Sequence, residues 1–477
     1  MLTFDEYRRH DAVGLAELVA LGEVAAAELL ATAIARCEAV DPQINALSQR
    51  HWDEARHAIE TGLPDGPLKG VPFLLKDVSV QMAGTVTSNC SKLYAGNLAT
   101  QDSTLVDRYK RCGLVIFGKT NTPEMGLAAS TETALHGITP NPWNLMRTPG
   151  GSSGGAGAAV ASGIVPAAQG SDGGGSIRIP ASCCGLFGLK PTRGRVPAGP
   201  MVGEGWGSMS AAHVLTRSVR DSAALLDATQ GAAPGDPYSA PPVLRPYLRE
   251  LADRPARLRV ALQLAPLSGS PVDAECSAAA REAARTMQAL GHEIEDAMPP
   301  GNAEELGRAA WVLVASNVSA TLHRRARALG RTLDEADVEA VTWRAVRQAA
   351  TMSAADHADA LLTIHLHGRR MAAFHERYDI VMSPTLGQVP ALLGPQRMSN
   401  PDGDEYASAL LRFTPFTNLF NMSGEPSMSV PLHWTPDELP VGVMFSAGFG
   451  REDLLFRLAA QLEEARPWFD RVPPFAP

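Results

Sequence analysis

The chain of 477 residues is long enough for one large α/β domain or for two to three ordinary ones. With 45% hydrophobic and 19% charged residues, it has the composition of a globular protein with a substantial core, which excludes a disordered chain. The 51 acidic residues outnumber the 42 basic ones, and the net charge of −9 gives no electrostatic reason to expect binding to nucleic acid or to an anionic membrane.

In chain order, the first half is expected to form helices followed by buried strands. Apolar residues at helical spacing predict two short helices over 12–40. The compact apolar runs "GVPFLLKDVSV" at 70–80 and "GLVIFGKTN" at 113–121 predict buried strands. The small residues of "GAGAAVASG", at 155–163, suit a tightly packed helix.

The second half continues the alternation of strands and helices. Residues 254–295 read as strand, helix and strand, and residues 302–377 as almost wholly helical. The last expected elements are strands at 378–385, 427–434 and 441–448, and a helix from Asp453. Because apolar strands alternate with helices, we expect an α/β fold with a mixed central β-sheet that is covered by helices on both faces.

Local sequence also bears on the compartment. The first 20 residues carry acidic side chains and no long apolar run, so no signal peptide is expected. No window offers the roughly 18 uninterrupted apolar residues of a membrane-spanning helix. The six cysteines are scattered and form no CxxC motif, which favours a reducing compartment. We therefore expect a cytoplasmic protein.

One motif imitates a nucleotide-binding loop. Residues 113–120, "GLVIFGKT", fit the GxxxxGK[ST] pattern letter for letter. A phosphate loop needs middle residues that curl so that their backbone N–H groups point inward. The middle residues here are Leu, Val, Ile and Phe, which favour an extended buried strand, so we reject nucleotide binding.

Two glycine runs that contain serines lie close together, "GGSSGG" at 150–155 and "SDGGGSIRIP" at 171–180. Glycine in such density costs backbone entropy, which indicates a local need for conformational freedom. A flexible linker is one interpretation, but the second run continues into "IRIPASCCGLFGLKP", which is typical of buried, ordered chain. The other is acyl transfer, in which bare backbone amides beside a serine hydroxyl stabilise an oxyanion.

A serine nucleophile needs a base, and the sequence offers two kinds. The twelve histidines leave a Ser-His-Asp triad open, although none lies within 35 residues of Ser176. Lys76, in "FLLKDV", is the alternative, because a lysine in an apolar strand is rare unless it is paired or functional. Burial lowers the pKa of a lysine, so that its neutral amine is able to accept a proton. An alternative without catalysis is that Lys76 stands in this strand because it forms an ion pair with Asp77.

Together these residues resemble a known family. "GGSSGGAGAAVASG" and "GSDGGGSIRIPA", preceded by "GVPFLLKD" and "GKTNTPEMG", are similar to the motifs of the amidase signature family, including the separation of 24 residues between two serines. The resemblance extends from about residue 10 to the C-terminus. It implies the amidase signature fold in a single domain, whose parts are a catalytic core at 65–230, a pocket-shaping region at 254–400 and a segment at 401–477 that closes the sheet.

The resemblance implies a hydrolase that cleaves amides through a serine acyl-enzyme, with a Ser–cis-Ser–Lys triad. Ser176 is then the nucleophile, Ser152 the bridging serine after a cis peptide bond, and Lys76 the general base. The other implied site residues are Gly173, Gly174, Gly175 and Ser176, whose amides form an oxyanion hole, and Ser153, Asp172 and Arg178, which support it. No metal and no cofactor is implied.

Within this family, the C-terminal half is most similar to the 6-aminohexanoate cyclic-dimer hydrolases that act on nylon oligomers, for example in "LTRSVRDSAALLDATQGAAPGDPYSAP" at 215–241. One departure is the pair Gly173 and Gly174, where those enzymes have alanines, and we expect the loss of two methyl groups to widen the acyl site. A roomy apolar site suits aryl or alkyl amides or nylon-type oligomers. We expect it to be lined from 302–377 and from a Gly- and Pro-rich flap in 386–425.

Alternatives stay open beside this reading. Carbamates (urethanes) and esters share the acyl carbonyl, so the same triad would also suit a urethanase or esterase. The amidase subunit of a tRNA-dependent amidotransferase shares the triad but works with partner chains, and a non-catalytic relative would act as a binding scaffold. We expect a small-molecule amide, carbamate or ester substrate and a monomer or homodimer. Further candidates for the pocket lining are Trp143, Trp206 and Met201, although tryptophan and methionine are more often part of the hydrophobic core than of a pocket.

Overall fold

The structure is a computed structural model, described here over residues 2–474. Its main feature is an 11-stranded sheet, beside which β4 and β5 form a separate two-stranded sheet. The strands are β1 (Leu47–Arg50), β2 (Pro72–Lys76), β3 (Val115–Thr120), β4 (Glu132–Thr133), β5 (Gly137–Ile138), β6 (Ala167–Asp172), β7 (Phe187–Lys190), β8 (Ala211–Thr216), β9 (Arg259–Leu262), β10 (Glu293–Asp296), β11 (Ile380–Pro384), β12 (Ser427–Trp434) and β13 (Pro440–Ala447).

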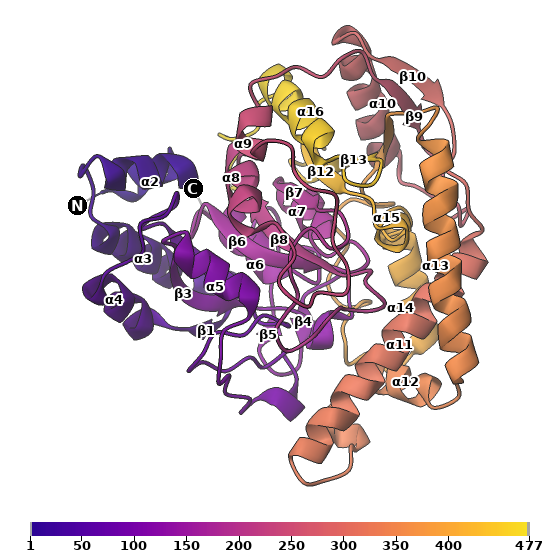
Figure 1. The fold of residues 1–477 in the computed structure, drawn as a ribbon, viewed down its shortest axis with the longest axis horizontal. Coiled ribbons are helices and arrows are strands. Elements are labelled where there is room, and N and C mark those ends of the chain that lie inside the picture. Colours follow the sequence, from indigo (N-terminus) through magenta and orange to yellow (C-terminus); the bar gives the residue numbers. More distant parts are fainter. Residues whose placement is uncertain (1, 475–477) are drawn as a thin grey trace.

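Helices surround this sheet (Figure 1). The α-helices are α1 (Phe4–Arg8), α2 (Ala12–Ala20), α3 (Ala26–Ile44), α4 (Trp52–Thr61), α5 (Thr104–Arg111), α6 (Gly154–Ala161), α7 (Arg178–Cys184), α8 (Val219–Thr229), α9 (Tyr247–Glu250), α10 (Ala274–Ala289), α11 (Ala303–Ala328), α12 (Ala340–Ala349), α13 (Ala354–Phe374), α14 (Gly403–Phe413), α15 (Leu419–Ser423) and α16 (Glu452–Ala465). Short 3-10 helices are η1 (Lys92–Tyr94), η2 (Glu124–Gly126) and η3 (Glu335–Asp337).

The strand order of the main sheet is β1-β3-β2-β6-β8-β7-β12-β13-β11-β9-β10. β2 lies parallel to β3 and β6, and β9 lies parallel to β10 and β11. The remaining pairs of neighbours are antiparallel. The sheet is therefore mixed, and it joins the N-terminal and C-terminal parts of the chain into one hydrogen-bonded layer.

Side-chain alternation along β13 shows that both faces of the sheet are covered. Val443 and Phe445 belong to the hydrophobic cluster that also buries the apolar faces of α10 and α16. A Cβ placed on Gly442 would come within 2.8 Å of the Cβ of Ser182, which lies in α7. Successive residues of a strand point to opposite faces, so α7 covers one face while α10 and α16 cover the other. The long helices α11 and α13 pack side by side beyond the sheet (Figure 1).

The expected α/β class, with a mixed sheet between helices, is confirmed. The apolar runs at 70–80 and 113–121 form β2 and β3, and both strands are buried throughout. Residues 113–120, which imitate a phosphate loop, are thus largely strand β3, as expected. The loop expected at 386–425 is wrong in part, because this segment contains α14 and α15.

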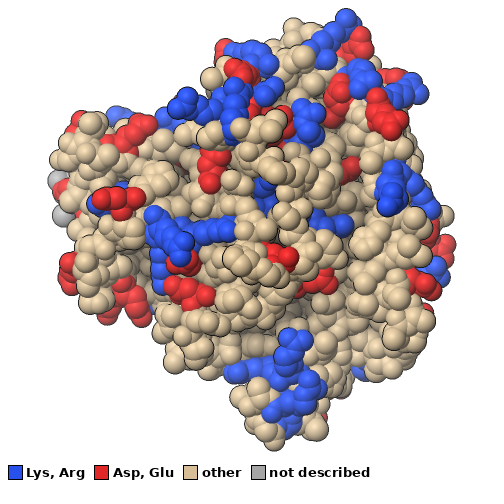
Figure 2. Space-filling view, viewed as in Figure 1, with Lys and Arg blue, Asp and Glu red and all other residues tan. Residues whose placement is uncertain are grey.

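Charge is mixed over the face of the molecule drawn in Figure 2. Lys and Arg side chains are interspersed there with Asp and Glu, apart from a small basic group at the lower end of the view, over the last turns of α11. Arg324, Arg327 and Arg331 lie exposed at this end of the helix. Among residues 2–474, no helix combines the length and the apolar character needed to cross a membrane.

Candidate active site

The topology brings the two glycine runs and the buried lysine to one edge of the sheet. Lys76 is the last residue of β2, and Asp172, which ends β6, leads into the run that contains Ser176. Because β2 and β6 are parallel neighbours, their carboxyl ends meet at the same edge. Ser152 lies two residues before α6, a helix that packs against both β2 and β6. Residues from positions 76, 152 and 176 therefore meet at one place.

Lys76 contacts a serine hydroxyl. Its side chain is fully buried, and Nζ lies 2.7 Å from Oγ of Ser152 and 3.0 Å from Oγ of Ser171. Burial lowers the pKa of this amine from its ordinary value to about 7, against the opposing effects of Asp172 and Cys90. An amine with this pKa is substantially uncharged at neutral pH, so it is able to accept a proton from the hydroxyl it touches.

Ser152 is held by close backbone packing. The Gly151–Ser152 peptide bond is cis, and Ser152 is buried. A Cβ on Gly151 would come within 2.7 Å of the backbone at Ala128, and a Cβ on Gly126 within 3.2 Å of the Ser152 Oγ. The first glycine run is therefore needed because its backbone lies against other backbone, where side chains have no room.

Ser176 follows a loop that is organised around the Asp172 carboxylate. The amides of Gly175 and Ile177 donate to its two oxygens, at 2.7 and 3.2 Å. The Arg178 guanidinium donates to both oxygens at 2.9 Å, and this ion pair is fully buried. Burial alone would raise the pKa of Asp172, but Arg178 and a hydrogen bond from Asn421 hold it well below its ordinary range. Asp172 is therefore charged and shapes the loop that carries Ser176.

The expected oxyanion hole needs one correction. The amide of Gly175 was expected to face the substrate, but it donates to Asp172 because the loop turns back on that carboxylate. In residues 2–474, no hydrogen-bond acceptor is found for the amides of Gly173, Gly174 or Ser176. These three donors are the ones free to bind an oxyanion.

The hydroxyls of the two serines are not joined directly. Within the described chain, no hydrogen bond links Oγ of Ser152 to Oγ of Ser176; the backbone provides the link, because the Ser153 amide donates to the Ser176 carbonyl at 3.2 Å. The hydroxyl of Ser153 lies 3.3 Å from both the backbone nitrogen and the carbonyl oxygen of Ser171. Catalytic hydrogen bonds are often long in ligand-free sites and tighten when substrate binds.

Sequence reasoning missed four residues that hold the site. Gln169 accepts the Lys76 backbone amide at 2.9 Å, and Ser171 contacts the Lys76 amine. Thr417 donates its hydroxyl to the Gly174 carbonyl at 2.6 Å, and the Asn421 amide donates to the Asp172 carboxylate at 2.8 Å. Two features of the sequence could have pointed to three of these residues. Ser171 stands inside the second glycine run. Thr417 and Asn421 lie in the segment "TPFTNLFNMSGEPSMSVPL" at 414–432, which is similar to a segment of the family.

Of the three candidates for the pocket lining, Trp206 lies beside the site. A Cβ on Gly173 would come within 2.6 Å of its ring, so the expectation that glycine widens the site at this position is wrong: the indole takes up the space. Trp143 is core, because its indole donates to the Cys184 carbonyl and its ring packs near Trp434. Met201 is partly exposed.

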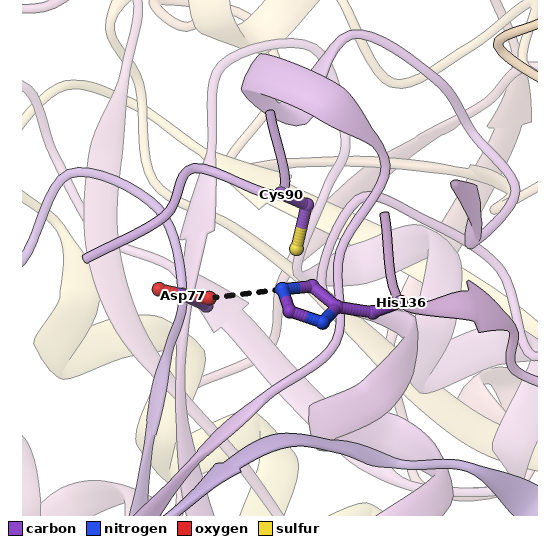
Figure 3. A group of neighbouring side chains, drawn as sticks. All are labelled: Asp77, Cys90 and His136. Carbon is purple, nitrogen blue, oxygen red and sulfur yellow. Dashed lines mark ion pairs between the residues drawn. The ribbon is translucent and has the colours of Figure 1, made fainter. Parts of the chain in front are cut away.

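Next to Lys76 in sequence, Asp77 forms a cluster with Cys90 and His136 (Figure 3), whose ligand atoms all lie within 4.8 Å of one another. The Ser88 hydroxyl stands between these groups, bonded to the Asp77 carboxylate and 3.1 Å from the His136 Nε2. Burial also raises the pKa of the Cys90 thiol well above its ordinary value, which keeps it protonated. We therefore interpret the cluster as a hydrogen-bonded support for the end of β2 rather than as a metal site.

Comparison with known proteins finds a matching family model, relatives similar in sequence and solved structures of similar fold. The model of a family described as Amidase matches residues 28–456. The 6-aminohexanoate-cyclic-dimer hydrolase of Paenarthrobacter ureafaciens is 40% identical over 479 aligned positions, which cover 97% of this chain and 96% of that protein.

Two solved structures share the fold over nearly their whole length. A 6-aminohexanoate cyclic dimer hydrolase in complex with substrate matches with a TM-score of 0.92 and 38% identity, covering 98% of this chain and 99% of the other. A bacterial aryl acylamidase of the amidase signature family matches with a TM-score of 0.86 and 28% identity, covering 96% of each chain.

Proposed function

Because this chain belongs to the amidase family and is an amide-hydrolysing enzyme, we propose that it cleaves the C–N bond of small amides through an acyl-enzyme on Ser176. Ser152 and Lys76 complete the triad in this proposal. The observation that carries it is the buried Lys76 amine, with a pKa of about 7, which lies 2.7 Å from the Ser152 hydroxyl.

The first half of the reaction transfers the acyl group to the enzyme. Uncharged Lys76 accepts a proton from Ser152, which takes one from Ser176 as the Ser176 Oγ forms a bond to the substrate carbonyl carbon. The carbonyl oxygen becomes an oxyanion that accepts hydrogen bonds from the amides of Gly173, Gly174 and Ser176. The proton then returns through Ser152 to the amine nitrogen, the C–N bond breaks, and the amine leaves.

The second half hydrolyses the acyl-enzyme. A water molecule gives its proton to the same relay and attacks the acyl carbonyl carbon. The tetrahedral intermediate collapses, the bond to the Ser176 Oγ breaks, and that oxygen takes back a proton. The carboxylic acid leaves, and Lys76 is again uncharged. Every proton that leaves a residue of the triad returns to it or passes to the products, so water is the only co-reactant that the cycle consumes.

We propose aryl or alkyl amides and nylon-type oligomers as the substrate class. The likeness to a 6-aminohexanoate-cyclic-dimer hydrolase and to an aryl acylamidase supports this class. Anilides, aliphatic amides, the cyclic 6-aminohexanoate dimer, carbamates and esters, compared by kcat/KM, form the panel that tests it. Preference for a carbamate or an ester over every amide would contradict the proposal.

The triad is tested by covalent labelling. A fluorophosphonate is expected to modify Ser176 in the wild-type protein, as read by mass spectrometry of the labelled peptide. Ser176→Ala is expected to abolish labelling while the thermal unfolding temperature stays close to that of the wild type. Labelling of a different residue, or full activity of Ser176→Ala, would remove Ser176 as the nucleophile.

A further inference from the structure

Trp206 is a residue beside the reacting centre to which the mechanism gives no role. It lies in the loop between β7 and β8, and its six-membered ring rests against Gly173. A Cβ on Gly173 would lie 2.6 Å from Cε3 and 2.7 Å from Cζ3 of that ring, closer than such atoms approach in folded proteins. The ring therefore occupies the space next to one of the proposed oxyanion donors.

The ring is supported from behind by the long helices. Trp206 is half-buried and packs against the hydrophobic cluster that contains Leu313 of α11 and Ile364 of α13. The following residue, Gly207, lies so close to α11 that an added Cβ would come within 3.0 Å of Leu313. Arg193 also holds the loop, because its guanidinium donates to the Ser208 carbonyl at 3.0 Å. These contacts fix the indole as a wall.

Ser152 and Gly173 lie against different neighbours in the site. Ser152, which returns the proton to the leaving amine in the proposed reaction, lies against Gly126. Gly173 lies instead against Trp206. In the proposed binding mode, the amide nitrogen faces Ser152 and the acyl group faces the indole beside Gly173.

We propose that Trp206 is a specificity-determining residue that forms the wall of the acyl side and limits branching at the carbon next to the reacting carbonyl. The inference rests on the proposed function of Ser176 and Ser152. It also explains the glycine at position 173, because alanine and Trp206 compete for the same space. The substrates favoured are amides of unbranched acyl groups.

The first experiment compares acyl groups on one leaving group. The ratio of kcat/KM for isobutyranilide to kcat/KM for acetanilide is expected to rise about tenfold in Trp206→Ala, since a methyl group in an apolar pocket discriminates by about 10-fold or more. Trp311→Ala is the matched control, because Trp311 is exposed on the outer side of α11, where its indole bonds to Gln348. That control is expected to leave the ratio unchanged. An unchanged ratio in folded Trp206→Ala, or in Trp206→Leu if the alanine variant does not fold, would overturn the proposal.

The second experiment tests the competition for space. Gly173→Ala is expected to lower kcat/KM about 100-fold, because small displacements of catalytic groups have effects of that size. Adding Trp206→Ala is expected to restore most of this loss. Gly174→Ala is the comparison, because its Cβ would meet only Asn418, at 3.8 Å, so its effect is expected to be the same with and without Trp206→Ala. Absence of rescue at position 173 would overturn the proposal.

Failure of this inference is distinguishable from failure of the proposed function. Fluorophosphonate labelling of Ser176 in the wild-type protein reports on the nucleophile alone and does not depend on acyl selectivity. If Ser176 is labelled and Trp206→Ala keeps the wild-type selectivity, only the role of Trp206 is lost. If Ser176 is not labelled, the proposed function is lost as well.

Discussion

Two buried lysines lie near the carboxyl ends of neighbouring parallel strands, and of these two only Lys76 touches a serine of the proposed site. Lys76 pairs in register with Thr120, and Lys119 pairs with Leu75, so the two lysines stand one position apart and point to opposite faces. Burial lowers the pKa of both amines, to about 7 for Lys76 and about 8 for Lys119.

Their partners differ. The Lys76 amine contacts the hydroxyl of Ser152, whereas the Lys119 amine donates to the Val86 carbonyl and to the Thr87 hydroxyl at 2.6 Å. Desolvation therefore does not by itself make a lysine a base for catalysis. The contact with Ser152, a serine of the proposed triad, distinguishes the first lysine from the second.

The largest expected difference between the two lysines is in activity. Lys76→Met is expected to lower kcat/KM by about 1,000-fold or more, because the base of the relay is lost while the length of the side chain is kept. Lys119→Met removes an equally buried amine outside the site and is expected to retain activity within about twofold of the wild type. Initial rates on an anilide, with thermal unfolding as the folding control, measure both. Equal losses of kcat/KM in the two folded variants would contradict the expected difference between Lys76 and Lys119.

Their hydroxyl partners sharpen the same contrast. Ser152→Ala is expected to lower kcat/KM by about 100- to 1,000-fold, because the relay between Lys76 and Ser176 is interrupted. Thr87→Val removes the hydroxyl beside Lys119 and is expected to lower the free energy of unfolding by about 1–3 kcal/mol without a change in kcat. Denaturant unfolding and steady-state kinetics on both variants provide the test. Near-wild-type activity of Ser152→Ala would show that Lys76 does not act through this serine.

The pH dependence of the reaction is expected to report the titration of Lys76. Below its pKa of about 7 the amine is protonated and unable to accept a proton, so kcat/KM rises as the pH increases through 7. From pH 6 to pH 8 the uncharged fraction increases about tenfold, and kcat/KM is expected to follow. Lys119→Met should leave the midpoint in place. A rate that falls over this range would contradict an uncharged amine as the base.

The smallest expected effect belongs to Ser171, the second hydroxyl at the Lys76 amine. Ser171→Ala is expected to lower kcat/KM by about 3- to 10-fold, because one hydrogen bond that positions the amine is lost. The same hydrogen bond stabilises the protonated amine, so the midpoint of the pH profile should move to lower pH. A pH profile of the variant measures both, and a midpoint that moves upward would contradict this role.

The sequence predicted several strands whose side chains are large and apolar, and it missed one whose side chains are mostly small. β2 and β3 follow from their apolar runs, whereas β6, "AAQGSD", is an inner strand made mainly of small and polar residues. β6 is extended because β2 and β8 pair with it on both sides, which is a property of the sheet and not of the segment. β7 and β8 were also missed, although both contain large apolar residues.

The site shows the same limit. The positions of Lys76, Ser152 and Ser176 could be singled out because lysine in an apolar strand and serine among glycines are both locally unusual. The bond between the Gly175 amide and Asp172 depends on the turn that the loop makes, and the contact of Thr417 with Gly174 joins residues 243 positions apart. Neither has a signature in the neighbouring sequence, so an oxyanion donor was misassigned and a supporting residue was missed.

The charge of the Lys76 amine is the property on which the proposed reaction depends most. It can be measured by NMR titration of protein labelled with ¹⁵N at the lysine Nζ atoms, with Lys76→Met, Lys119→Met and Lys190→Met used to assign the three buried amines, since the pKa of Lys190 is also lowered to about 7. A Lys76 resonance that titrates near pH 7, next to a Lys119 resonance that titrates near pH 8, is expected. A Lys76 amine that stays protonated up to about pH 10, the ordinary value for lysine, would contradict its role as the base.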